Sequence, residues 1–270
     1  MDEILGYLLD DLGSLTACSL TCKRLFGATR PLIHRQLVCL DPRPNLPKRK
    51  KSLLSRCKKD PGPFERLIEA DRSGILRYTR QLTLKPKDGS LRPRFNPKDL
   101  QESLPHLRSI TQLHGLTLIK FLLPPFIPTF NEHFGIFTNT LRQLDLRNAY
   151  GTAWEFLYII SQFLLLEDLT IVSPVGERTA NPGRQIQAIT QSPPLRGKLI
   201  LGQAAWRHLS EGLAAFPGGL NFRSLEFSWS KYLEPIFTAC GRTATSISYL
   251  WPRGDINSEL NSSIQAYIVT

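Results

Sequence analysis

The side chains most able to do chemistry in this chain are its histidines, which are scattered along the sequence. They are His34, His106, His114, His133 and His208. Only Glu132 and His133 stand together, and neighbouring residues on a helix point to different sides. No GxG, GxxxxGK[ST], GxSxG or HExxH pattern occurs. The sequence therefore predicts no enzyme, although a triad assembled in space needs no such proximity in sequence.

The cysteine pattern predicts neither a disulfide framework nor a metal site. There are five, an odd number without a CxxC pair, which is not a disulfide framework. Cys18 and Cys22 share a helical face, but no histidine or acidic ligand is near them. Two such cysteines are typical of packing groups rather than a metal site. We expect no metal and no cofactor.

The composition predicts a folded intracellular protein. Of the 270 residues, 41% are hydrophobic and 21% are charged, which is a globular mixture. No apolar run reaches the ~18 residues that a membrane span needs, and no secretory signal pattern opens the chain. Five cysteines without a disulfide pattern fit the same compartment.

Positive charge is concentrated at the front of the chain. The formal net charge is +11, and residues 1–100 carry 21 Lys and Arg against 11 Asp and Glu, which leaves +1 for the rest. Residues 41–63 combine five prolines with eight basic residues, which predicts an exposed linker. Within it, Lys48, Arg49, Lys50 and Lys51 resemble a nuclear-localisation run. A solvated linker, nuclear import and nucleic-acid contact stay open as interpretations.

Residues 1–40 predict a head of three short helices. Ile4, Leu5, Leu8 and Leu12 lie near one helical face. Gly13 is expected to end that helix and Ser14 to cap the next one. So small a head buries little apolar area, so it must pack on the body or offer surface to a partner.

The head resembles an F-box. The resemblance covers about 40 residues and is carried by Glu3-Ile4-Leu5-Gly6-Tyr7-Leu8 and by Ser19-Leu20-Thr21-Cys22-Lys23-Arg24-Leu25-Phe26. The Leu-Pro pair that usually precedes Glu-Ile-Leu in the family is absent. The resemblance implies docking to a Skp-type adaptor of a cullin ubiquitin ligase. By position it implies adaptor contacts from Ile4, Leu5, Leu8, Leu12, Leu15, Cys22, Lys23 and Leu25. The alternative role for these residues is a helical cap on the body.

The rest of the chain repeats one apolar pattern. Hydrophobic residues recur as h-x-x-h-x-h, clearly at Leu113–Leu118, Leu141–Leu146, Leu166–Ile171 and Phe222–Phe227. Including weaker copies, the central positions 82, 116, 144, 169, 199, 225 and 247 follow one another by 22 to 34 residues, near the spacing of leucine-rich repeats. Between them, apolar stripes at helical spacing predict helices. Leu37–Leu40 offers an earlier edge strand. No Asn or Cys follows the clear copies at the ladder position, so turns are expected to vary between repeats.

The predicted fold is α/β. An F-box-like head (residues 1–40) and a basic linker (41–63) precede an irregular leucine-rich-repeat-like solenoid with a parallel strand face (64–270). The resemblance of head and body together implies the substrate-recognition subunit of a cullin-type ubiquitin ligase, binding an unknown target protein. A repeat scaffold with a vestigial head is the alternative. The outward positions expected to meet a partner are Arg142, Asp145, Arg147, Glu167, Asp168, Arg223 and Glu226, unless they are merely solvated.

Overall fold

A computed structural model provides the structure of the chain. It describes residues 11–21, 23–40, 63–85, 104–124, 127–176, 192–202, 207–228 and 232–250. The predicted first helix around Ile4–Leu8 and the linker run Lys48–Lys51 lie outside these residues.

The central element is one sheet of eight strands, and every neighbouring pair is parallel. The strands stand in chain order, from β1 at one edge to β8 at the other. They are β1 (Gln36–Leu40), β2 (Gln81–Lys85), β3 (Gly115–Ile119), β4 (Gln143–Arg147), β5 (Asp168–Val172), β6 (Leu195–Gly202), β7 (Leu220–Ser228) and β8 (Ser246–Leu250). The predicted α/β class is confirmed, and the sheet takes in residues 36–40 as its first strand.

The repeated hydrophobic positions lie opposite one another across the whole sheet. Leu82 pairs with Leu116, and the same row continues to the last strand. Its members are Leu82, Leu116, Leu144, Leu169, Leu199, Leu225 and Ile247. Side chains alternate between faces along a strand, so this row and the next, from Leu84 to Phe227, share the inner face. β2 and β5 accordingly alternate between half-buried and buried residues.

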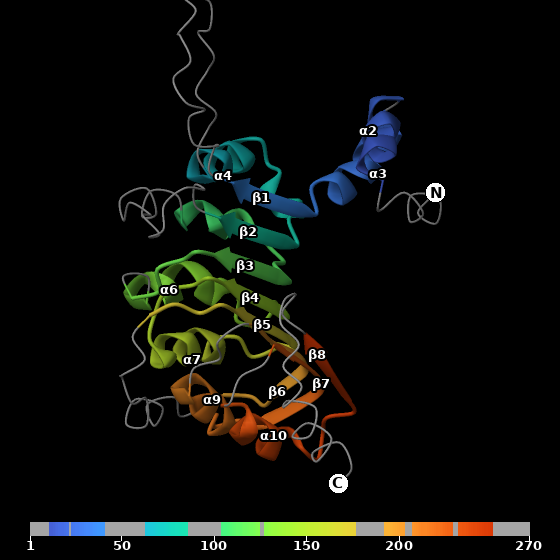
Figure 1. The fold of residues 1–270 in the computed structure, drawn as a ribbon. Coiled ribbons are helices and arrows are strands. Elements are labelled where there is room, and N and C mark those ends of the chain that lie inside the picture. Colours follow the sequence, from blue (N-terminus) through green and yellow to red (C-terminus); the bar gives the residue numbers. More distant parts are fainter. Residues whose placement is uncertain are drawn as a thin grey trace, which may run out of the picture.

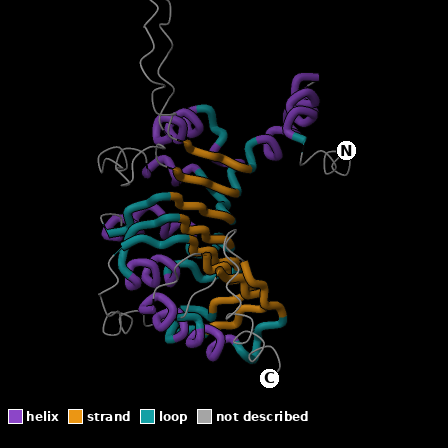
Figure 2. The backbone as a smooth tube through the Cα atoms, viewed as in Figure 1, coloured by secondary structure: helices purple, strands orange, loops and turns teal. Residues whose placement is uncertain are grey.

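Helices cover the inner face of the sheet. Each parallel pair of strands needs a crossover, and helical segments supply several of them. They are α4 (Pro63–Arg72), η1 (Leu76–Tyr78), η2 (Leu104–Ser109), α6 (Ile127–Phe134), η3 (Gly135–Phe137), α7 (Ala153–Ser161), α9 (Arg207–Ala214) and α10 (Glu234–Cys240). Figures 1 and 2 show this helical layer on one side of the curving strands. None of the described helices has the length and apolar character to cross a membrane.

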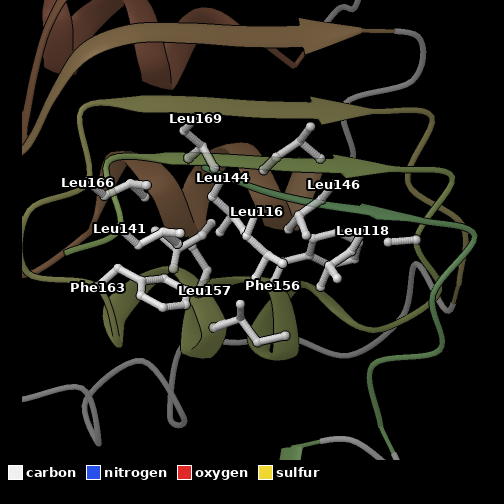
Figure 3. Packing of buried hydrophobic residues seen from close by; sticks show 14 of the residues in the cluster. Leu116, Leu118, Leu141, Leu144, Leu146, Phe156, Leu157, Phe163, Leu166 and Leu169 are labelled. Carbon is white, nitrogen blue, oxygen red and sulfur yellow. The ribbon is translucent and has the colours of Figure 1, made fainter. Parts of the chain in front are cut away.

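The core lies between the strands and this helical layer. Phe156 and Leu157 of α7 meet the leucines of β3, β4 and β5 (Figure 3). Phe130 and Phe134 of α6 stack with ring centroids 5.0 Å apart, and Phe163 meets Phe130 edge-on at 5.8 Å. Such aromatic pairs add to the stability gained from burying their area. Among the described residues, the helical apolar stripes predicted from spacing lie in this core or pack against it.

The turns after β3, β4 and β5 share one geometry, so the expected variation is wrong for these repeats. Lys120, Asn148 and Ser173 each follow a strand with φ of 52°, 51° and 48°. Leu122, Tyr150 and Val175 then form parallel bridges from one repeat to the next. The ladder position between them holds buried apolar residues instead of asparagine, including Phe121 and Ala149. Repeated backbone hydrogen bonds therefore fix the turn without an asparagine ladder.

The pairing of β6 with β7 contains a β-bulge. Gly197 lies opposite Phe222 and Lys198 opposite Ser224, so Arg223 has no counterpart on β6. Phe222 and Leu225 are both buried although two residues separate them, and the extra residue makes this possible. Arg223 is exposed at the bulge.

The described part of the head is a helix pair, α2 (Leu12–Thr21) and α3 (Lys23–Ile33). The expected break at Gly13 is wrong, because α2 runs through this residue. The Asp11 carboxylate caps the helix instead, accepting from the Ser14 backbone N–H at 3.0 Å and its hydroxyl at 2.6 Å. These hydrogen bonds lower the pKa of Asp11. α3 continues through Pro31 and leads directly into β1.

A hydrogen bond between Asp71 and His106 ties α4 to η2 and makes stability depend on pH. The His106 Nδ1–H donates to Asp71 Oδ2 at 2.6 Å. The hydrogen bonds of His106 and Ser109 lower the pKa of Asp71. A carboxylate with a lowered folded pKa adds stability above its unfolded pKa, and that stability is lost as the pH falls through the folded pKa.

We therefore expect Asp71→Asn to lower the thermal unfolding midpoint at neutral pH. The difference from the wild type should shrink as the pH falls below about 4, where the wild-type carboxyl also becomes protonated. Thermal unfolding followed by circular dichroism between pH 3 and pH 7 measures this. Glu69→Gln, an exposed change on the same helix, is the control. Equal midpoints of D71N and the wild type at neutral pH would contradict the assignment.

Candidate protein-binding face

The outer face of the sheet carries polar side chains and no described helix covers it. A hollow of about 220 Å³ lies on this face over β2 to β6. Residues at outward positions of five neighbouring strands line the hollow. The leucines on the opposite face hold these strands in register. The hollow is thus a product of the repeat itself, and any partner that enters it contacts several repeats at once.

One row across the hollow combines amides with a carboxylate. It runs Gln81, Gly115, Gln143, Asp168 and Lys198 on successive strands. A Cβ atom on Gly115 would lie 3.2 Å from Gln81 Cγ and 3.4 Å from Gln143 Oε1, so both glutamines lie beside the glycine. Gln143 Nε2 donates to Asp168 Oδ2 at 3.1 Å. This row offers hydrogen-bond donors and acceptors of the kind that recognise peptide groups.

The next row is mostly hydroxyl. Thr83, Thr117, Asp145 and Thr170 stand on successive strands, with Ile200 after them. Arg147 Nε donates to both Asp145 oxygens, at 3.0 and 2.9 Å, in a compact pair two residues apart on β4.

This hydrogen bond to Asp145 raises the pKa of Arg147. The negative charge of Asp145 is therefore already compensated by Arg147 on the same strand. The Arg147 side chain is 53% exposed and keeps N–H donors for a partner.

Further ion pairs join neighbouring strands. Arg142 pairs with Glu167, and Lys198 Nζ lies 2.5 Å from Glu226 Oε2. Pairs as exposed as Arg142 and Glu167 contribute about 0–1 kcal/mol to stability, so the fold does not depend on them. The charges within these ion pairs balance each other. A partner can therefore break such a pair and form its own ion pairs at a small cost in free energy.

The structure brings most of the predicted partner residues together. Arg142, Asp145, Arg147, Glu167 and Asp168 lie on or beside β4 and β5. Glu226 is linked to this group by its ion pair with Lys198, which lies opposite Asp168. Arg223 lies apart from the group, at the bulge. Sequence reasoning missed Gln81 and Lys198, which stand in weaker copies of the repeat. Extending the strand alternation to every repeat would have found them.

Burial is described for two of the expected adaptor contacts, Leu15 and Leu25, and neither is fully exposed. Leu15 is 1% exposed and Leu25 is half-buried, so both pack within the helix pair. Leu20 was not among the expected contacts, yet 82% of it is exposed. Ile4, Leu5, Leu8 and Cys22 lie outside the described residues, and nothing is described of the side chains of Leu12 and Lys23.

Two titratable sites lie away from this face: the Cys240 thiol, and the pair formed by His106 and Asp71. In the described ranges, no three His, Cys, Asp or Glu side chains gather as metal ligands. Burial raises the pKa of the Cys240 thiol to about 11, which keeps it protonated at neutral pH and a poor nucleophile. His106 and Asp71 are engaged with each other between α4 and η2. The hollow instead offers amide, hydroxyl and charged groups aligned on parallel strands.

Comparison with known proteins adds no family assignment. No family model matches the sequence, and the search of curated proteins gives no match.

Proposed function

We propose that this protein is the substrate-recognition subunit of a cullin-type ubiquitin ligase. Its F-box-like head would dock a Skp-type adaptor, and its leucine-rich-repeat-like solenoid would hold a target protein. The motif in residues 3–26 suggests the family. One structural observation carries the proposal: a helix pair leads directly into an array of parallel strands whose outer face no described helix covers.

The positions of the two parts support a bipartite platform. The helix pair lies beyond the β1 edge of the sheet, apart from the helical layer (Figure 1). Arg30 fastens it there, donating to the Ser73 carbonyl at 3.1 Å and lying 5.9 Å from the Tyr78 ring centre. A ligase bound to the head and a target bound to the strand face would be held together on one chain. Such tethering raises the effective concentration of the target.

The exposed side chain of Leu20 supports a partner for the head. Covering a leucine of this exposure contributes about 1.5–3 kcal/mol to binding. Leu20 is the penultimate residue of α2 and lies two residues before Cys22, where the segment begins for which the F-box resemblance implies adaptor contacts. We therefore add Leu20 to the candidate adaptor contacts. Leu15, being buried, would act by holding the helix pair together.

A repeat scaffold outside any ligase is the second candidate. The contacts of Arg30 with Ser73 and Tyr78 favour it, because they fix the helix pair to the first repeat, where it can serve as a cap on the array. Both candidates use the strand face for a protein partner. They differ in whether the head binds an adaptor.

A pull-down with a purified Skp-type adaptor separates the two candidates. The wild type should retain the adaptor, and Leu5→Asp combined with Leu8→Asp should abolish retention, since two charges would enter an apolar interface. The matched control is Ile136→Asp, an exposed change on the body that should bind like the wild type. Circular dichroism should give all three proteins the same folded spectrum. Failure of the wild type to bind would leave the scaffold role.

A further inference from the structure

Basic residues occupy the positions immediately before the first four strands. Arg35, Arg80, His114 and Arg142 precede β1, β2, β3 and β4, and we call this set the basic row. The Arg80 N–H donates to the Arg35 carbonyl at 2.8 Å, His114 N–H to Arg80 at 2.7 Å, and Arg142 N–H to His114 at 2.8 Å. The four residues are thus direct neighbours across the sheet, spaced by the ~4.8 Å between strands.

The row leaves positive charge without an acidic partner. Like charges on neighbouring strands oppose folding. Only Arg142 has a carboxylate partner, Glu167, while Arg80 Nη1 donates to the Gln112 carbonyl at 3.3 Å. Over the described residues, neither Arg35 nor Arg80 forms an ion pair. Desolvation first, and then the charges of Arg80, Arg142 and Arg35, lower the pKa of His114, so the field of the row reaches this residue.

We propose that the basic row binds an acidic segment of a protein, lying extended across strands β1 to β4. The role of that segment as a ligase target rests on the proposed function, but its binding does not. The row spans three strand intervals, about 14 Å. In an extended peptide, side chains on one face repeat every ~6.6–6.8 Å, so three of them cover nearly the same span.

The matching partner sequence therefore carries Asp or Glu at alternate positions, i, i+2 and i+4. Glu167 stands directly after Arg142 in the same row and repels further carboxylates. The acidic part of the segment must then end near β4. Beyond that point the polar hollow over β2 to β6 can take the neighbouring uncharged residues of the partner.

The test is fluorescence anisotropy with the full chain and two labelled peptides. One alternates serine with three glutamates over seven residues, and the other has glutamine in place of each glutamate. At low ionic strength the acidic peptide should bind and the neutral one should not. Arg35→Gln with Arg80→Gln should weaken binding about tenfold. Arg108→Gln with Arg207→Gln removes the same charge on the helical side and should change binding less than twofold.

Each other outcome overturns the proposal. If the acidic peptide does not bind, the proposal is wrong. If both double variants weaken binding equally, the peptide responds to the net charge of the protein and not to the basic row. Tighter binding of an oligothymidylate of equal charge, lost in R35Q/R80Q, would assign the row to nucleic acid. Neutralising Lys48–Lys51 should leave peptide binding intact. If this variant no longer binds the peptide, the binding site lies in the linker and not in the basic row. Because no adaptor is present, the result is independent of the pull-down.

Discussion

Phe156→Ala should lower the free energy of unfolding by about 3–5 kcal/mol. Phe156 is fully buried on α7 and lies between this helix and the leucines of β3 and β4 (Figure 3). Removing the ring leaves a cavity that neighbours cannot fill, because the strands on one side are fixed by their ladders. Urea unfolding followed by circular dichroism measures the change, with the slope compared to that of the wild type.

Ile136→Ala is the matched control for this core substitution. Its side chain is 47% exposed beside the same helical layer. We expect a loss below about 1 kcal/mol, because little apolar area leaves the core. Similar losses for the two variants would mean that α7 does not pack on the strands as described.

Gly197→Ala has the second largest expected effect, about 3 kcal/mol. Gly197 has φ of 75°, and an added Cβ would lie 2.2 Å from the Glu167 carbonyl oxygen. Backbone on both sides must shift to relieve this overlap, which pulls β5 and β6 apart at the bulge. The loss of stability is measured by the same urea unfolding.

Gly135→Ala serves as the comparison, because no atom lies within 4 Å of its added Cβ and its φ is not positive. This variant should keep the wild-type midpoint or exceed it slightly. A Gly197→Ala protein with unchanged stability would show that β6 does not pass Glu167 at the described distance.

The strand register could be predicted from sequence because one hydrophobic row must face the core in every repeat. A slip of one residue at Leu144 or Leu199 would turn that leucine outward, so the pattern permits a single alignment. The outward positions follow from the same alternation, which is why Asp145 and Glu226 were found on the polar face. The helical phenylalanines followed from their spacing for the same reason.

The features that escaped prediction depend on contacts between repeats. The positive φ of Asn148 follows from hydrogen bonds to the next turn, which no local pattern encodes. The basic row needs the register before Arg35 and Arg80 can be recognised as neighbours, since 44 residues separate them in the chain. Asp11 and not Ser14 caps α2, because this helix begins before Gly13 and continues through it. One glycine does not end a helix that packs against α3.

The chain order of the strands has a consequence for how the molecule opens. Each strand bonds only to the strands before and after it, and among the described elements no ladder closes the two ends of the sheet. Ile247 on β8 is already 50% exposed, although its counterparts in the same row are buried. Loss of structure can therefore advance strand by strand from an end, without one global event. Resistance to opening then forms a gradient along the chain, greatest in the middle strands.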